Sequence, residues 1–291
     1  MPHHAAFRLA GRAGAAALVM LLLALSAWPA RAEPRPCGED APCRAGEGEY
    51  YLAFPDDWDG ESPLPAVLYF HSHRSSGLSG IRSAALRQEF SDHGYLIIAP
   101  NGELRANGVR GWAARPATGG GRDDLAFIDA VMSDAAARVP LDRSRVLVTG
   151  FSSGGSMVWL VACYEGASFA GYVSIAGALR RPVPDGACPG GPVRMLHFHG
   201  FADTTVPIEG RGIRDWHQGD VFESMSILRQ TDDCRSNPDR IVSEQNYGCR
   251  IWSGCASGMG VELCLHAGGH MLPDGWAGRA RNWFESGIGG S

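Results

Sequence analysis

Lysine is absent from this chain, so all 26 of its basic residues are arginine. A serine–lysine catalytic dyad, a Schiff-base enzyme and a P-loop phosphate site each require the lysine amine. The composition therefore excludes these three mechanism classes. The formal net charge is −5, and it becomes −8 when the first 32 residues, which hold three arginines and no acids, are removed. Nucleic acid and anionic membranes are therefore poor candidate partners.

The chain also lacks an apolar run long enough to span a membrane. The run over residues 13–25 is shorter than the roughly 20 residues that a spanning helix needs. It follows two arginines and precedes Ala30-Arg31-Ala32, which is the pattern of a secretory signal peptide and its cleavage site. We therefore predict that residues 1–32 are a signal peptide, a membrane anchor being the alternative. Residues 33–291 show no linker or repeat and are expected to form one domain, secreted or periplasmic.

The eight cysteines lack the paired Cys-x-x-Cys spacing of a zinc site. An even number of cysteines behind a signal peptide favours disulfides instead. Eight cysteines allow many pairings, and spacing alone does not choose among them. The set that we consider first is Cys37–Cys43, Cys163–Cys188, Cys234–Cys255 and Cys249–Cys264.

Short apolar runs alternate with longer helical stretches along the chain, which is typical of parallel strands joined by helices. We predict a mostly parallel central sheet with helices on both faces, whose chemistry lies at the carboxyl ends of the strands. The strands are expected at residues 66–70, 95–99, 145–149, 171–175 and 193–198. The helices are expected at residues 80–92, 124–138 and 153–163, followed by a hairpin over 249–265 and a last helix near 275–284.

The strongest motif is Gly150-Phe151-Ser152-Ser153-Gly154, which lies between a predicted strand and a predicted helix. A serine between glycines at this spacing is typical of a strained strand-to-helix turn that presents its hydroxyl to substrate. The positive end of the helix then lies beside the oxyanion that develops during attack. We therefore predict that Ser152 is a nucleophile, a plain glycine-rich turn being the alternative.

A serine nucleophile needs a histidine to accept its proton and a carboxylate to orient that histidine. Where such a turn carries a triad, the chain order is serine, acid, histidine. Asp203 lies in a loop directly after the predicted strand 193–198, which favours it over three other acids that follow in the chain. These rivals are Glu209, Asp215 and Asp220.

The candidate base is His270, which follows two glycines in the loop after the apolar run 261–265. His266 lies at the end of that run, where a buried or edge histidine is ordinary. His217 lies in a polar stretch that we expect to be helical. The predicted catalytic residues are therefore Ser152, Asp203 and His270.

Several motifs in one order give the chain a family resemblance over residues 48–284. They are a strand followed by His71, the Gly102 turn, Asp123-Asp124 opening a helix, Gly-Phe-Ser-Ser-Gly-Gly, His199-Gly200 before Asp203, and Gly268-Gly269-His270. Together they resemble the secreted polyhydroxybutyrate depolymerase and feruloyl esterase family. The resemblance implies a single-domain α/β-hydrolase fold, a carboxylic ester substrate, no cofactor, no metal, and the same three residues as the triad.

The chain departs from this family after the strand that is expected to supply the oxyanion loop. Where the family usually has His-Gly, this chain has His71-Ser72-His73, so the loop that supplies the second oxyanion donor is reshaped. We place the oxyanion donors at the backbone N–H groups of Ser153 and His73. Trp112 is a candidate substrate-binding wall, with a place in the core as the alternative. The acyl group, whether hydroxybutyrate, hydroxycinnamate or acetate, is left open, and small or oligomeric esters are favoured because no polymer-binding domain is recognisable.

Two other functions remain alternatives. His71 with His73 and His197 with His199 repeat a spacing that can bind a catalytic metal, with Asp203 nearby, as in a metal-dependent hydrolase. That hypothesis leaves the serine turn unexplained. A non-catalytic binding domain on the same fold is the second alternative, and such a domain would normally have lost part of the triad.

Overall fold

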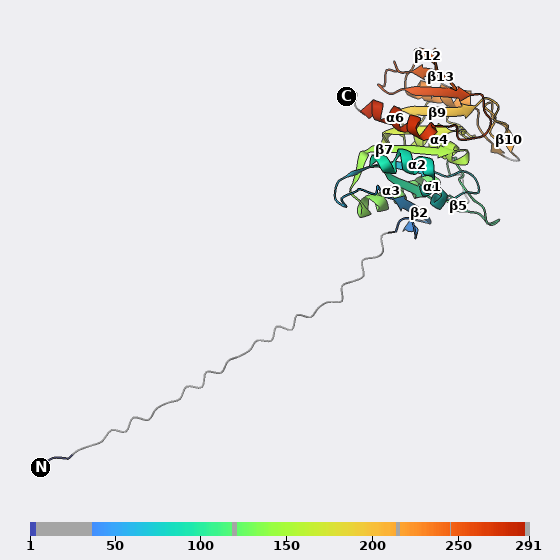
Figure 1. The fold of residues 1–291 in the computed structure, drawn as a ribbon. Coiled ribbons are helices and arrows are strands. Elements are labelled where there is room, and N and C mark those ends of the chain that lie inside the picture. Colours follow the sequence, from blue (N-terminus) through green and yellow to red (C-terminus); the bar gives the residue numbers. More distant parts are fainter. Residues whose placement is uncertain (4–36, 118–120, 214–215, 245, 289–291) are drawn as a thin grey trace. The chain divides into compact units, whose positions relative to one another are not determined.

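The computed structural model describes residues 1–3, 37–117, 121–213, 216–244 and 246–288. Residues 37–291 form one compact unit, which carries the sheet and helices of Figure 1. All but the first three residues of the predicted signal peptide, 1–32, lie outside the described residues, so that assignment stays a prediction. Within the described ranges, no helix has the length and apolar character needed to cross a membrane.

A ten-stranded sheet runs through this unit in the order β1-β2-β4-β3-β7-β8-β9-β14-β13-β12. The strands from β4 to β14 in that order are parallel, and the strands at both edges are antiparallel. The predicted mostly parallel sheet is therefore confirmed. The strands are β1 (Cys43–Ala45), β2 (Gly48–Ala53), β3 (Leu64–Phe70), β4 (Leu96–Pro100), β7 (Leu141–Phe151), β8 (Gly171–Ile175), β9 (Met195–Gly200), β12 (Arg240–Glu244), β13 (Tyr247–Trp252) and β14 (Val261–His266).

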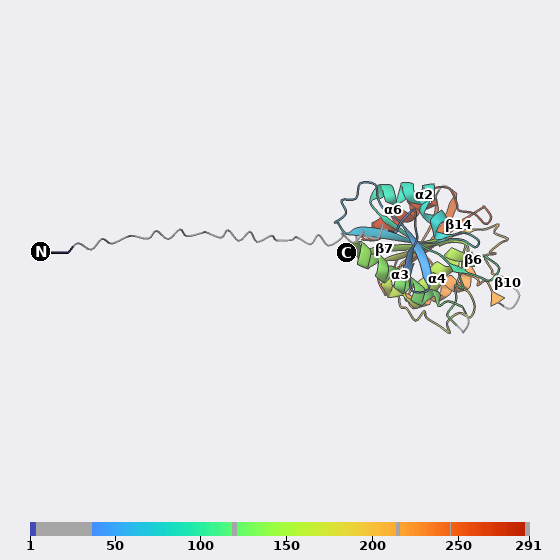
Figure 2. The same cartoon turned by 90° about the horizontal axis from the view of Figure 1, so that it is seen from below.

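Helices cover both faces of the sheet, as Figure 2 shows for α2 and α6 on one side and α3 and α4 on the other. The first layer is α1 (Gly77–Ile81), α2 (Ala84–Glu89) and α6 (Trp276–Ile288). The second layer is α3 (Asp124–Arg138), α4 (Ser153–Tyr164) and α5 (Val221–Thr231). Alternate side chains of a strand point to opposite faces, so Leu68 and Phe70 of β3 pack in the α3–α5 core, whereas Val67 packs in the other.

Most of the predicted elements are confirmed to within a few residues, and two predictions are wrong. The single helix expected over 80–92 is two short helices, because Ser83 caps a new helix with its hydroxyl accepting from the Leu86 N–H. The stretch around His217, expected to be helical, contains the two-residue strand β11 (Trp216–His217), which pairs with β10 (Gly212–Ile213). A second small hairpin joins β5 (Glu103–Leu104) to β6 (Arg110–Gly111).

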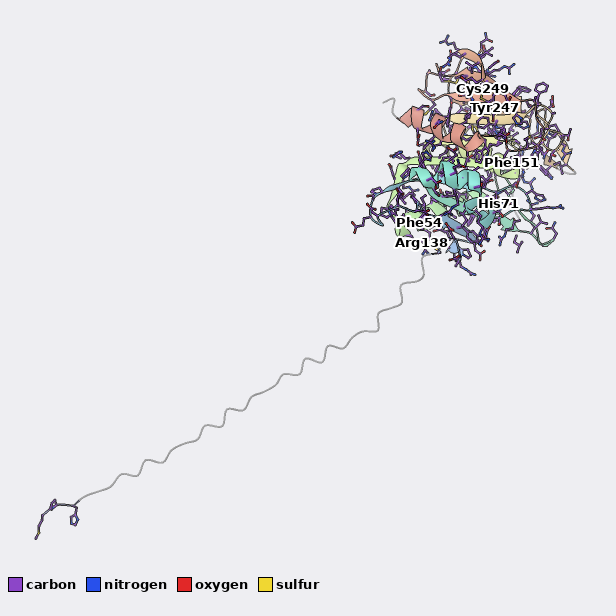
Figure 3. All side chains as sticks on the ribbon, in the orientation of Figure 1. Phe54, His71, Arg138, Phe151, Tyr247 and Cys249 are labelled. Atoms are coloured by element: carbon purple, nitrogen blue, oxygen red, sulfur yellow. A yellow bond between two sulfur atoms is a disulfide. The ribbon has the colours of Figure 1, made fainter. Side chains whose placement is uncertain are left out.

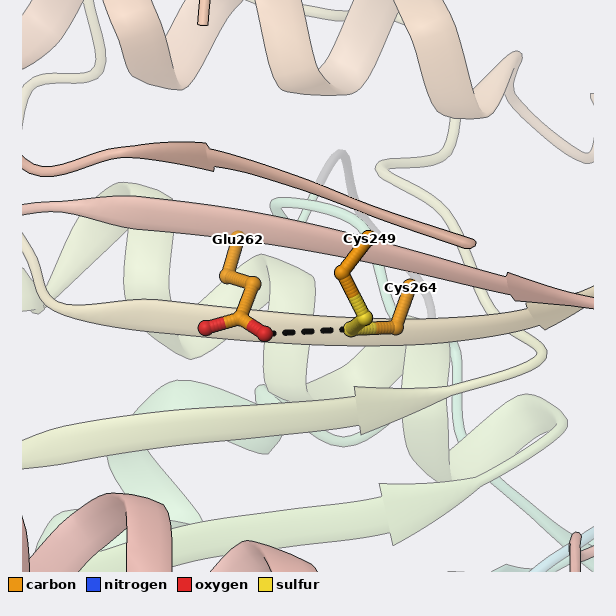
Figure 4. Close-up of side chains that lie close together, drawn as sticks. All are labelled: Cys249, Glu262 and Cys264. Carbon is orange, nitrogen blue, oxygen red and sulfur yellow. Dashed lines mark hydrogen bonds between the residues drawn. A yellow bond between two sulfur atoms is a disulfide. The ribbon is translucent and has the colours of Figure 1, made fainter. Parts of the chain in front are cut away.

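All four disulfide pairings are confirmed, and the described residues contain no free cysteine. Cys249 and Cys264 face one another on β13 and β14, where their bond cross-links the hairpin. Glu262 lies beside this bond (Figure 4), which makes these three residues the one group of potential metal ligands that the described residues form. Because the two sulfur atoms are bonded to each other, neither is available as a thiolate ligand.

Candidate active site

Ser152 occupies a strained turn between β7 and α4. Its backbone angles are φ 59° and ψ −119°, in the region that residues other than glycine rarely adopt, and its N–H donates to the Ile175 carbonyl at 2.9 Å. Gly154 permits this turn, because a Cβ atom there would lie 2.0 Å from the Phe70 carbonyl oxygen. Figure 3 shows His71 and Phe151 on one side of the molecule, where β3 and β7 end.

The structure brings together His270 and Ser152, which are 118 residues apart in the chain. The His270 Nε2 atom lies 2.8 Å from the Ser152 Oγ atom, and the His270 Nδ1 atom lies 2.7 Å from the Asp203 Oδ2 atom. Since a carboxylate accepts at Nδ1, that nitrogen carries the proton and Nε2 is free to accept the serine hydroxyl. The Phe151 ring stacks on the imidazole with 4.9 Å between ring centroids, which fixes its plane.

Asp203 is a fully buried carboxylate whose two oxygen atoms are both engaged. Oδ1 accepts the backbone N–H groups of Thr205 and Val206 at 2.9 and 2.8 Å, while Oδ2 accepts from His270. These charge-assisted hydrogen bonds offset the cost of burying the charge. The loop after β9 therefore holds the carboxylate in one position, and that position orients the imidazole.

The rival acids and bases do not enter this arrangement. Glu209 is exposed, and Asp220 caps α5 by accepting the Glu223 N–H at 2.9 Å. Asp215 lies outside the described residues. The Nδ1 atom of His266 accepts the Gly268 N–H at 3.2 Å, and burial lowers the pKa of His266.

The backbone N–H groups of Ser153 and His73 are the predicted oxyanion donors. In the hydrogen bonds formed by the described residues, neither group donates to a protein acceptor. Both residues line the same cavity as Ser152. Two unpaired donors are therefore available beside the hydroxyl, and their role in the reaction stays a prediction.

The cavity next to Ser152 has a volume of about 560 Å³. Trp112 forms part of its wall while its side chain is almost wholly buried, with the indole N–H donating to the His71 carbonyl at 2.9 Å. The tryptophan therefore belongs to the core and to the cavity wall at once. Contact between Trp112 and a substrate remains a prediction.

Sequence reasoning missed the basic character of this cavity. Its lining includes four arginines, Arg105, Arg115, Arg180 and Arg211, together with Trp216 and Gln218. One feature of the sequence indicates this basic character, because Arg180 lies a few residues beyond the carboxyl end of β8. Polar residues at that edge of a parallel sheet are the ones that meet a ligand.

The histidine pairs of the metal hypothesis are mostly occupied by hydrogen bonds. The His71 Nε2 atom accepts the Gly102 N–H at 2.8 Å, and its Nδ1 atom lies 2.8 Å from the Ser72 carbonyl oxygen. The His199 Nε2 atom donates to the Val206 carbonyl, which leaves Nδ1 to accept from His197 at 3.1 Å. Among the described residues, these histidines do not gather into one group of potential ligand atoms. The geometry therefore opposes a metal centre built from them.

The buried His71 makes the stability of the protein depend on pH. Burial lowers its pKa to about 4, whereas an unfolded histidine titrates near ~6.5. Between these values the unfolded chain binds a proton that the folded protein does not, so stability is lost as the pH falls through this window, by ~3 kcal/mol for this group. Urea unfolding at pH 7 and pH 4.5 should show a smaller loss for His71→Asn than for the native protein. Equal losses would contradict this account.

No protein-family model matches this chain. It is 32% identical to a probable feruloyl esterase C of Aspergillus niger and 30% identical to feruloyl esterase C of Emericella nidulans, each match covering 56% of this chain and 57% of the relative. The chain thus spans little more than half the length of these two relatives. Feruloyl esterase D of Neurospora crassa is 25% identical, over 86% of this chain and 87% of the relative.

Solved structures share the fold at lower identity. An acetyl xylan esterase from Aspergillus awamori aligns with a TM-score of 0.65 at 17% identity, covering 82% of this chain and 94% of its own. A Bacillus cereus carboxylesterase aligns with a TM-score of 0.55 at 14% identity, covering 83% and 95%. The predicted α/β-hydrolase fold and the resemblance to feruloyl esterases are therefore confirmed.

Proposed function

We propose that this chain, an α/β-hydrolase similar in sequence to feruloyl esterases, is a secreted serine esterase that hydrolyses carboxylic esters. The observation that carries the proposal is the unbroken line of hydrogen bonds from Ser152 through His270 to the buried Asp203. The line lies beside a cavity of about 560 Å³ that can accept an ester. The four disulfides support an oxidising compartment, in keeping with secretion.

The geometry suits a two-step acyl transfer. The Ser152 hydroxyl attacks the ester carbonyl while His270 accepts its proton and then passes that proton to the departing alcohol. Asp203 keeps the imidazole in the tautomer that can accept at Nε2 and stabilises the imidazolium as it forms. A water molecule, deprotonated by His270, then attacks the acyl-enzyme and releases the acid. No metal or cofactor is assigned a role in either step.

The tetrahedral intermediates carry a negative charge on the former carbonyl oxygen. The free N–H groups of Ser153 and His73 lie where the cavity meets the nucleophile and would donate to this oxygen. Because Ser153 begins α4, the positive end of the helix faces the same oxygen. The proposed donor is the backbone N–H of His73, which does not depend on the side chain at position 72. The serine that stands there in place of the family's usual glycine therefore leaves this role available to His73.

The substrate panel that tests this function contains methyl ferulate, acetylated xylan and short hydroxybutyrate oligomers. We expect hydrolysis of at least one of them, measured as acid release at constant pH, with no loss of rate in EDTA. A serine-directed phosphonylating reagent is expected to abolish the same activity. Loss of activity in EDTA together with resistance to the phosphonate would move the catalytic centre to the histidine pairs.

The Cys249–Cys264 bond braces the hairpin that leads to the base, since β14 ends at His266 and His270 follows in the next loop. Both cysteines are fully buried, so a double substitution tests this bond better than a reductant does. We expect Cys249→Ala with Cys264→Ala to lower the free energy of unfolding by ~2–4 kcal/mol. Displacing the base by about 1 Å can cost ~100-fold in rate, so activity should fall at temperatures where far-ultraviolet dichroism is unchanged.

The matched control is Cys37→Ala with Cys43→Ala, which removes the bond that closes a short loop at the other edge of the sheet. This variant should keep its esterase rate. Parallel loss of rate and dichroism in the Cys249 and Cys264 variant would contradict the local bracing of His270.

A further inference from the structure

The cavity beside Ser152 is basic in a chain whose net charge is negative. We define the arginine wall as Arg105, Arg115, Arg180 and Arg211, all of which line this cavity. Arg180 is 8% exposed, whereas the other three are exposed. The wall therefore has one buried guanidinium and a rim of three solvated ones.

Arg180 is held by groups that do not neutralise its charge. Its Nη1 atom donates to the carbonyl oxygens of Trp112 and Ala113 at 3.1 and 2.8 Å, and its guanidinium carbon lies 4.8 Å from the centre of the Trp216 ring. Its buried Nε atom has no hydrogen-bond partner. A buried arginine in a folded protein is normally paired with a carboxylate. Here two carbonyls and an aromatic ring fix the guanidinium in place, and no carboxylate of the described residues lies within ion-pair distance of it.

The acids near the arginine wall are engaged elsewhere. Asp124 forms a buried ion pair with Arg122 at 2.8 Å and accepts the Ala113 N–H at 2.9 Å. Glu103, which also lines the cavity, accepts the backbone N–H of Arg122 at 3.2 Å. Among the residues that the structure describes, no arginine of the wall forms an ion pair.

The surroundings of Arg180 disfavour its charged form. Burial, followed by the positive charges of Arg105 and Arg115, lowers the pKa of Arg180 to about 10, although the Asp124 carboxylate acts in the opposite direction. Burial also lowers the pKa of His73, with Arg105 and Arg180 among the further causes. An anion entering the cavity would relieve this repulsion and would replace the water that solvates the rim.

Building on the proposed esterase function, we propose that the arginine wall binds a free carboxylate group carried by the ester substrate. A guanidinium offers two parallel N–H donors that match the two oxygens of a carboxylate, and Arg180 is fixed in place before the ligand arrives. Two kinds of ester have this chemistry. The carboxylate is on the acyl side in a half-ester of a dicarboxylic acid, and on the alcohol side in an ester of a hydroxy acid, as in a short hydroxy-acid oligomer.

The experiment compares esters that carry a carboxylate with esters of the same chain length that carry a neutral group in its place. The acyl-side pair is 4-nitrophenyl hydrogen glutarate and 4-nitrophenyl pentanoate. The alcohol-side pair is 3-butanoyloxypropanoate and its amide. We expect kcat/KM to favour the anionic ester in one pair, which identifies the source of the carboxylate. Arg180→Gln should lower the anionic-to-neutral ratio ~10–100-fold, because hydrogen bonds to charged groups are the strong ones.

Two further variants separate binding from folding. Arg211→Gln at the exposed rim should lower the same ratio without removing the buried contacts of Arg180. Arg143→Gln is the matched control, because Arg143 is exposed near the amino end of β7, away from Ser152 at the other end. This variant should keep the ratio of the native protein.

Calorimetric titration with pentanoate and with the neutral pentanamide tests the anion site without catalysis. Pentanoate should bind the native protein more tightly, and Arg180→Gln should remove the difference. A kcat/KM ratio of one or less in both ester pairs would overturn the inference and leave the esterase function standing. Hydrolysis of none of the esters would contradict the proposed function, and equal binding of pentanoate and pentanamide would then overturn the carboxylate site as well.

Discussion

Replacing Ser152 with alanine is expected to lower the esterase rate by a factor of ~10⁴ or more while the protein stays folded. The hydroxyl oxygen forms the covalent bond to the acyl group, and no neighbouring side chain takes its place at 2.8 Å from the His270 Nε2 atom. Alanine keeps the Cβ atom that the turn at φ 59° already accommodates. The turn depends on backbone contacts, such as the bond from the Ser152 N–H to Ile175, and not on the hydroxyl.

The control for this variant is Ser144→Ala, which changes the same residue type on β7, the strand that precedes the Ser152 turn. Ser144 is exposed, and its hydroxyl donates to Asp142 at the far end of β7 from the nucleophile. Its rate should stay within about twofold of the native rate, since surface changes of this kind have small effects. Near-normal turnover by Ser152→Ala, with a thermal unfolding midpoint like that of the control, would exclude the serine mechanism.

Replacing Asp203 with asparagine is expected to cost ~10⁴-fold in kcat, with a smaller change in KM. The Oδ1 atom accepts the N–H groups of Thr205 and Val206, so the asparagine oxygen should remain there and the NH₂ group should face His270. That group donates to Nδ1, which forces the ring proton onto Nε2. A protonated Nε2 atom does not accept the Ser152 proton, so the attack loses its base.

Glu209→Gln is the matched control for this prediction, because it changes a rival acid in the loop that follows Asp203. Glu209 is exposed and makes no side-chain hydrogen bond within the described part of the chain. Its rate should stay close to the native one. A rate for Asp203→Asn within tenfold of native would mean that the orientation of the imidazole does not depend on this carboxylate.

The proximity of Ser152, Asp203 and His270 could be predicted from the sequence because each residue is marked by a local signal. Gly150 and Gly154 flank Ser152 on a strand-to-helix turn, and both glycines are required by close backbone contacts. Asp203 and His270 each follow a buried parallel strand, β9 or β14, and these two strands are neighbours in the sheet. Adjacent carboxyl ends therefore place the acid beside the base. The pairing of Cys249 with Cys264 was considered because the two residues flank a predicted hairpin, and the register of β13 and β14 places them opposite one another.

The remaining features either lack a local signal or depend on contacts between distant segments. The edge strand β12 was not predicted, because its residues are mostly exposed and show no alternating buried pattern. The helix expected over 80–92 is interrupted by a serine cap that overrides its helical propensity. Arg180 was missed because the groups that hold it, Trp112 and Ala113, are nearly 70 residues away in the chain. The partners of a buried arginine depend on the folded structure, so the sequence alone does not show that Arg180 lacks a carboxylate partner among the described residues.

In the proposed mechanism the Ser152 hydroxyl oxygen forms the covalent bond of the acyl-enzyme. Covalent labelling of this residue tests the mechanism most directly. The native protein is treated with a phosphonate ester bearing a 4-nitrophenyl leaving group, and the site of the added mass is determined by peptide mass spectrometry. We predict one phosphonyl group per chain, on the peptide that contains Ser152, with loss of esterase activity in proportion to labelling. Ser152→Ala should remain unlabelled. Labelling of that variant at the native rate, or modification of another residue in step with inactivation, would contradict the account.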